Sequence, residues 1–193
     1  MDDIRTVTHN GYIIHIQADD CPQDPREYDN LGIIIAFHRR YTLGDPHNYR
    51  SDDFTGWADM QAQIEKDYPG AVILPVYMYE HSMVALSTRS FLGRAQHAEW
   101  DSGRVGFIIA TRERIKEFRG WDRLTAPRLV KIQASLANEI ESYSKYLNGE
   151  AYGFTIEDPG TGDIIESRWG YEDTIDCEKE AKSYVPALAA VPA

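Results

Sequence analysis

The sequence has little cysteine, because only Cys21 and Cys177 occur in 193 residues, and neither lies in a spacing typical of zinc sites. We therefore expect two free thiols, no resident metal and no cofactor. No apolar run approaches the ~18 residues that a membrane span needs. The chain opens Met-Asp-Asp, without the basic and apolar pattern of a signal peptide. These absences predict a cytoplasmic protein with no membrane partner.

Several short motifs of enzyme chemistry are also missing. The sequence contains no Gly-x-Ser-x-Gly nucleophile elbow, no phosphate-binding loop and no dinucleotide-binding glycine pattern. No pair of histidines has a spacing that by itself indicates a metal site. Any catalytic site must therefore be assembled from residues that are far apart in the sequence.

Positive charge is scarce and unevenly distributed. The chain has 20 Lys and Arg against 31 Asp and Glu, a formal net charge of −11. Residues 150–182 hold ten acidic and three basic residues, a net charge of −7. Direct nucleic-acid binding needs the opposite field, so we do not expect it. An acidic face that binds a basic partner is one interpretation, and an acidic surface that only keeps the protein soluble is the other.

The pattern of apolar residues predicts an α+β fold in a single domain spanning 1–193, with a frayed tail over 185–193. We expect a largely antiparallel sheet packed by one long helix and several short ones. The long helix is predicted over 126–147, where apolar residues recur at steps of three and four. Strands are predicted over 11–18, 31–38, 71–79, 83–88, 105–110, 150–157 and 163–168, with a tight turn at 101–103. Shorter helices are predicted over 57–68, 112–118 and 172–184; Thr55 and Thr111 are the expected caps of the first two, and Gly120 follows the second.

The strand from Leu31 to His38 is apolar on both faces, which predicts a central position in the sheet. Polar clusters flank it, with Asp29, Asn30 and Gly32 at its start and His38 to Asp45 at its end. A strand of seven residues is about 23 Å long. We therefore expect the two clusters to lie at opposite ends of the strand and to form separate sites.

The end that follows the strand has more candidates for chemistry. One interpretation pairs His38 with Asp45 across the Thr42-Leu43-Gly44 turn, and the other is that His38 orients a turn and Asp45 caps a loop. His81 and Asp101 also lie near predicted strand ends. Together these four residues are of the right types for a metal-assisted hydrolase. Glu80-His81-Ser82 is not a triad, because successive strand residues point to opposite faces, and a turn is expected there.

With these segments laid out, the chain resembles a family of small uncharacterised proteins encoded by bacteriophages and plasmids. The similar stretches are PREYDNLG (25–32), HRRYTLGD (38–45), LPVYMYEHS (74–82), WDSGRVGFI (100–108), YLNGEAYGF (146–154) and RWGY (168–171). Members typically carry Cys-Pro before Trp-Asp-Ser-Gly, where this chain has Ala98-Glu99. The resemblance implies an accessory protein of a mobile element that blocks host defence by binding to it.

Two functions therefore remain open. The first is an anti-defence inhibitor that binds a host protein or defence complex through its acidic C-terminal face, with partner-binding residues Glu172, Asp173, Asp176, Trp169 and Tyr171. The second is a small metal-assisted hydrolase of a nucleotide or phosphodiester, with candidate catalytic residues His38, Asp45, His81 and Asp101.

Overall fold

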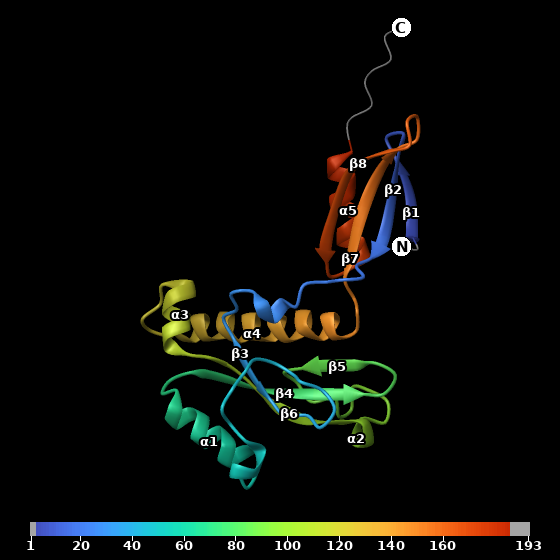
Figure 1. The fold of residues 1–193 in the computed structure, drawn as a ribbon. Helices are drawn as coiled ribbons and strands as arrows, with labels where there is room; N and C mark the ends of the chain where they lie inside the picture. The colour runs from blue at the N-terminus through green and yellow to red at the C-terminus, as the bar shows by residue number, and fades with distance from the viewer. Residues whose placement is uncertain (1–2, 186–193) are drawn as a thin grey trace. The chain divides into compact units, whose positions relative to one another are not determined.

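The computed structural model describes residues 3–185 and has an α+β fold (Figure 1). The predicted class and the antiparallel pairing are confirmed, but the strands form two four-stranded sheets instead of one. The chain divides into two compact units. Unit 1 combines the residues up to Asp24 with those from Lys145 onward, and unit 2 is Pro25–Ser144. Residues 186–193 of the expected tail lie outside the described residues.

Unit 1 is a four-stranded meander with the order β1-β2-β7-β8. Its strands are β1 (Asp3–His9), β2 (Tyr12–Ala18), β7 (Tyr152–Asp158) and β8 (Asp163–Tyr171). The first strand was not predicted, although Asn10 and Gly11 give a clear hairpin signal. Both have positive φ, 47° and 82°, as a two-residue hairpin turn requires.

Helix α5 (Thr174–Tyr184) covers one face of this sheet. Alternate residues of β2 and β7 point toward it and form a fully buried core with two small side chains of the helix: Ile14, Ile16, Phe154, Ile156, Cys177 and Ala181. The period-two pattern of the strands and the small residues of the helix together let the two layers pack closely.

Unit 2 contains the second sheet, in the order β3-β6-β4-β5. Its strands are β3 (Ile33–Ala36), β4 (Val72–Glu80), β5 (Val84–Ser87) and β6 (Ser102–Ala110). Helices α1 (Trp57–Asp67) and α4 (Ala126–Leu147, in unit 2 up to Ser144) lie on opposite sides of this sheet (Figure 1). The shorter helices are α2 (Ala98–Asp101), α3 (Arg112–Arg119) and the single turns η1 (Pro25–Glu27) and η2 (Ser51–Asp53).

The predicted central position of the 31–38 strand is wrong, because β3 is an edge strand. Its outer edge is covered by the chain that follows it. Gly44, at φ 75°, forms a bridge with Ile35, and the backbone N–H of Asp45 donates to the Ile34 carbonyl at 3.0 Å. The loop therefore covers the edge of β3, while Met60 and Ile64 of α1 pack in the same cluster as Ile35 on one face.

The ends of the helices are set by residues close to them in the sequence, and most of these were predicted correctly. Thr111 caps α3 by accepting from Arg114, and Gly120 ends that helix in the left-handed region, as predicted. Helix α4 has the predicted bounds. Gly56, not Thr55, is the residue before α1, and Thr55 instead donates to the Asp59 carboxylate.

Other local expectations are corrected. The turn expected at 101–103 is absent, since Asp101 ends α2 and Ser102 begins β6. In the described part of the chain, every helix falls short of the combined length and hydrophobicity needed to cross a membrane.

Candidate functional site

The candidate site is an open groove of about 540 Å³ at one end of the unit 2 sheet, which we call the histidine groove. Strand pairing creates it, because β4 and β6 are antiparallel with Tyr79 opposite Ser102. The end of β4 therefore lies beside Asp101, and the chain leaving β3 passes the same end. The functional side chains in its lining are His38, Arg39, Arg40, Glu80, His81, Trp100 and Asp101.

The first pair in the groove joins His81 to Asp101, with Nδ1 2.9 Å from Oδ2. Because the carboxylate accepts from Nδ1–H, the neutral ring leaves Nε2 as its proton acceptor. The His81 ring stacks near Tyr79, with centroids 6.3 Å apart, and lies 6.4 Å from the His97 ring. The side chain is 58% exposed, so this nitrogen is open to a ligand. The arrangement is that of an oriented general base.

The second pair joins His38 to Glu80 across 4.0 Å, which is an ion contact and too long for a hydrogen bond. Tyr41 donates its hydroxyl to Glu80 at 3.0 Å, and Arg40 lies 3.2 Å from the same oxygen. The hydrogen bond to Glu80 raises the pKa of Tyr41. His38 is stacked on Tyr41, with centroids 4.9 Å apart. Glu80 thus gathers three side chains at the groove wall.

The tautomer of His38 differs from that of His81. The backbone N–H of Arg40 donates to His38 Nδ1 at 3.3 Å. The neutral ring therefore carries its hydrogen on Nε2, the atom that faces Glu80. One imidazole of the groove thus presents a lone pair that can accept a proton, and the other presents an N–H that donates hydrogen bonds and becomes an acid when the ring is protonated.

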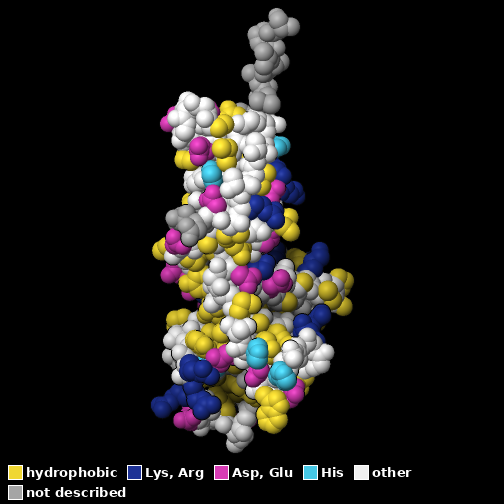
Figure 2. Space-filling model, turned by 90° about the vertical axis from the view of Figure 1, so that its right-hand side faces the viewer, with side chains coloured by type: hydrophobic (Ala, Val, Ile, Leu, Met, Phe, Trp, Pro, Cys, Tyr) yellow, Lys and Arg dark blue, Asp and Glu magenta, His cyan; other side chains and the backbone are white. Residues whose placement is uncertain are grey.

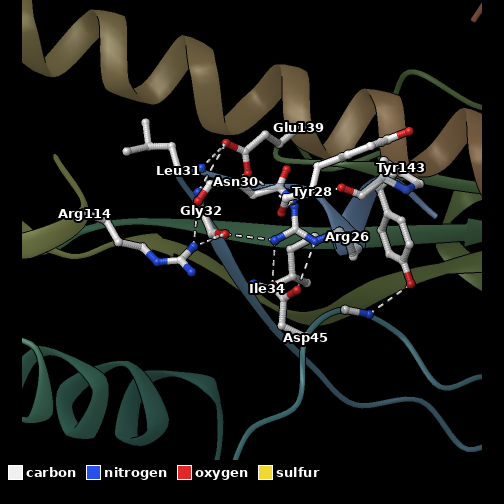
Figure 3. Close-up of polar contacts among 12 residues, drawn as sticks. Arg26, Tyr28, Asn30, Leu31, Gly32, Ile34, Asp45, Arg114, Glu139 and Tyr143 are labelled. Carbon is white, nitrogen blue, oxygen red and sulfur yellow. Dashed lines mark hydrogen bonds and ion pairs between the residues drawn. The ribbon is translucent and has the colours of Figure 1, made fainter. Parts of the chain in front are cut away.

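The expected pairing of His38 with Asp45 is wrong. Asp45 lies alongside the start of β3 and accepts from Arg26 at 2.6 and 3.1 Å and from the backbone N–H of Ile34 at 2.6 Å (Figure 3). Asp45 is therefore placed with the polar cluster at the start of β3, whereas His38, Arg39 and Arg40 line the groove. The chain reverses at Gly44, and this brings Asp45 back to the end of the strand that Arg26 approaches.

Arg26 links the loop before β3 to helix α4. Besides Asp45, it contacts Glu139 at 3.2 Å and donates to the Gly32 carbonyl at 2.8 Å (Figure 3). Glu139 in turn accepts from the backbone N–H groups of Leu31 and Gly32 at 3.0 Å. The Arg26 side chain is only 6% exposed. These residues, which we call the Arg26 network, stabilise the fold beside the groove and leave its chemistry to other side chains.

A metal site is not assembled by the four residues proposed for it. Asp45 belongs to the Arg26 network, whereas His81 and Asp101 bind each other in the groove. Across the described residues, no group of three or more His, Cys, Asp or Glu side chains is placed to hold a metal ion. The residues that sequence reasoning undervalued are Glu80 and the 83% exposed Trp100. Their place in the site follows from the register of β4 and β6, which cannot be determined from a single sequence.

The five expected partner-binding residues lie in unit 1, and most of them make contacts within the unit. Asp173 caps α5 by accepting from two backbone N–H groups, and Glu172 lies 3.4 Å from Lys145. Tyr171 packs on Phe154, and burial raises its pKa. The Trp169 ring covers Gly153, where a Cβ would overlap it. The Asp176 side chain is exposed and takes part in none of the contacts described above.

A third histidine cluster lies in unit 1. His15 Nδ1 is 2.6 Å from Asp3, and its Nε2 is 3.2 Å from Glu157. The hydrogen bond to Asp3 raises the pKa of His15, and the hydrogen bond from His15 lowers the pKa of Asp3. Both ring nitrogens are thus occupied by protein carboxylates, so this histidine contributes to stability and is less open to a ligand than His81.

Comparison with protein-family models, with curated proteins and with solved structures found no match. The function is therefore inferred from the side chains of the site. Figure 2 shows histidine side chains near one another on the lower part of the surface, over unit 2, with acidic, basic and apolar side chains around them; histidine and acidic side chains also lie on the upper part. The groove combines charged, titratable and stacking groups in one place.

Proposed function

We propose that unit 2 is a metal-independent hydrolase of a phosphodiester or nucleotide, acting in the histidine groove. One observation carries the proposal: two histidines of opposite tautomer, each next to a carboxylate, line the same groove. The substrate class is the one predicted from the sequence, a nucleotide or phosphodiester. Acid–base catalysis takes the place of the metal ion, and Glu80 takes the place of Asp45 among the site residues.

The proposed reaction is hydrolysis of a phosphodiester, with water as the only co-substrate. His81 Nε2 takes a proton from water, and the water oxygen forms a bond to phosphorus. For this step His38 is the imidazolium, with a second proton on Nδ1 in place of the hydrogen bond from the Arg40 N–H. The bond from phosphorus to the leaving oxygen breaks, and His38 gives its Nε2 proton to that oxygen. Asp101 stabilises the imidazolium that forms on His81, and exchange with solvent restores both rings. Arg39 stabilises the charge on the phosphate oxygens.

The groove also fits the other parts of a nucleotide. Trp100 presents an almost fully exposed ring on which a base can stack, an interaction that tolerates any base. Arg39 and Arg40 lie in the same lining and supply positive charge locally. A ligand of one or two nucleotides needs only such a local patch. The net charge of −11 therefore disfavours a long nucleic acid more than it disfavours a nucleotide.

The experiment is a turnover screen with excess chelator present. Dinucleotides, cyclic nucleotides and an activated phosphodiester are incubated with the wild-type protein, His38→Ala, His81→Ala and His9→Ala. His9 lies in unit 1 and is the matched control. We expect turnover by the wild type and His9→Ala and a loss of about 100-fold or more in the two groove variants. Turnover that depends on added metal, or that survives both groove substitutions, would argue against the mechanism.

A second candidate function is protein binding by unit 1, which is the function that the phage and plasmid resemblance implies. We propose it on the strength of β8, an edge strand whose Ile164 and Ile165 are 53% and 43% exposed. Exposed apolar edge strands pair readily with other chains. The acidic 150–182 segment favours a basic partner, such as a host nucleic-acid-handling defence complex.

The test of this second candidate is capture from host lysate with Ile164→Lys, which alters the edge, and Asp176→Lys, which reverses an exposed charge. Asp173 is kept, because its substitution would uncap α5. Loss of one captured basic protein in both variants is expected. The same capture by wild type and both variants would remove this acidic edge as the binding surface.

A further inference from the structure

We infer that a second pocket, beside the histidine groove, is a subsite for a phosphate group and that Arg104 provides its charge. This inference rests on the proposed function and names its substrate class: a nucleotide with a phosphate beyond the bond that is cleaved. The pocket, which we call the Arg104 pocket, has a volume of about 830 Å³ and shares His38 and Arg39 with the groove.

A bulge in β6 places Arg104 in this pocket. The β4–β6 register pairs Val76 with Gly106 but Tyr77 with Arg104, so Val105 is the extra residue. Without a bulge, Arg104 and Phe107 would point to opposite faces of the sheet. With it, the Arg104 guanidinium lies over the Phe107 ring, 4.1 Å from its centroid. Bulges often re-aim a side chain in this way next to a functional site.

The charge of Arg104 is poorly compensated within the protein. Its Nε is buried and has no hydrogen-bond partner among the described residues. The guanidinium contacts two ring faces, those of Phe107 and, at 5.6 Å, Trp57. Burial lowers the pKa of Arg104, which shows that its charge is partly removed from water. A desolvated cation without a carboxylate is costly, and a bound anion would offset that cost.

The walls of the pocket are consistent with an anion. Its carboxylate, Asp45, is engaged by Arg26 at 2.6 Å. Arg39 adds a second positive charge and Thr42 adds a hydroxyl group, whereas the hydroxyls of Tyr41 and Ser51 already donate to Glu80 and Asp52. His47 also lines the pocket, but its Nε2–H donates to the Ala36 carbonyl at 3.2 Å and its buried Nδ1 is an acceptor, so the neutral ring adds no donor for an anion.

Phosphate fits these groups better than a carboxylate does. Its several oxygens and higher charge suit a guanidinium, a second arginine and a hydroxyl donor together. The pocket is larger than a phosphate ion, so it has room for the ester part of a nucleotide. Because His38 and Arg39 belong to both cavities, a phosphate held by Arg104 would direct the adjoining ester bond toward the groove.

The test measures binding without turnover. Inorganic phosphate, a nucleoside 5′-monophosphate and acetate are titrated by calorimetry into the wild type, Arg104→Gln and Arg128→Gln. Arg128 is the matched control. Its guanidinium also lies over a tryptophan ring, 5.0 Å from the centroid of Trp121, but it is not part of the pocket lining. We expect phosphate and the monophosphate to bind the wild type and Arg128→Gln alike, and at least tenfold more weakly to Arg104→Gln.

Three results would overturn the inference: no phosphate binding by the wild type, equal binding by Arg104→Gln, or acetate binding as tight as phosphate binding. If Arg104→Gln does not fold, Arg104→Lys takes its place. It keeps the charge but loses the planar fork, so weaker phosphate binding is still expected, and unchanged binding would contradict the assignment.

The same titration separates this inference from the proposed hydrolase. His81→Ala is expected to bind phosphate as the wild type does, because His81 lies outside the Arg104 pocket. Phosphate binding that depends on Arg104, in a protein without turnover, would retain the subsite and reject the hydrolase. Turnover of a phosphodiester that carries a further phosphate, with the same KM in Arg104→Gln and in the wild type, would retain the hydrolase and reject the subsite.

Discussion

Replacing Arg26 with methionine is expected to destabilise unit 2 strongly, although the site of substitution is remote from the histidine groove. Methionine keeps most of the apolar stem, so the change removes mainly the charge. Arg26 donates two hydrogen bonds to Asp45 and one each to Glu139 and the Gly32 carbonyl. Its loss leaves two carboxylates, 19% and 17% exposed, without their cation.

The magnitude follows from that burial. Removing one partner of a buried ion pair costs about 3–5 kcal/mol, because the remaining charge stays desolvated. The backbone N–H groups that bond Asp45 and Glu139 retain their acceptors and keep the cost from rising further. For a unit of this size, the expected fall in melting temperature is about 10–20 °C.

The assay is urea unfolding followed by tryptophan fluorescence and circular dichroism. Lys116→Met is the matched control, because Lys116 pairs with Asp122 at 2.8 Å where both side chains are well exposed, and it is expected to match the wild type. Combining Arg26→Met with Asp45→Asn should cost less than the sum of the two single changes. A loss below about 1 kcal/mol for Arg26→Met would refute the reasoning.

Three further predictions concern other parts of the chain. Gly106→Ala should cost about 1–3 kcal/mol, because a Cβ there would overlap a carbonyl oxygen of β3, whereas Gly103→Ala on the same strand meets open space and should be nearly neutral in the same unfolding assay. Burial raises the pKa of the Cys177 thiol to about 11, so a thiol reagent should label exposed Cys21 in the native protein and Cys177 only after unfolding; rapid labelling of both would contradict this. The hydrogen bond to the β1 carboxylate raises the pKa of His15, so its contribution should be complete below about pH 6.5 and be lost as the pH rises through the raised value. The stability gap between wild type and His15→Gln should therefore be larger near pH 6 than near pH 9, and an equal gap would contradict the account.

Much of the fold could be predicted because its signals are local. The apolar stripe of α4 and the cap at Thr111 act within a few residues of the chain, and both were predicted correctly. The hairpin of β7 and β8 is equally local. The strand over 3–9 was missed despite the Asn10-Gly11 signal, because its residues are mostly exposed and lack a clear apolar face.

The site was harder to predict because it depends on pairing between distant segments. His81 and Asp101 were selected for their chemical types, but only the register of β4 and β6 makes them partners. Asp45 was assigned to the wrong cluster, because the reversal at Gly44 brings it back along β3. Arg104 carried no signal, since the bulge that re-aims it is a property of the paired strands.

The most direct test of the central claim is the rate of dinucleotide hydrolysis, with chelator present, by wild-type protein and by His81→Ala. General-base catalysis by His81 predicts turnover by the wild type and a fall of about 100-fold or more in the variant. Asp101→Asn should fall as well, since it loses the carboxylate that orients the ring. Equal rates for wild type and His81→Ala, or no hydrolysis by the wild type, would contradict the account.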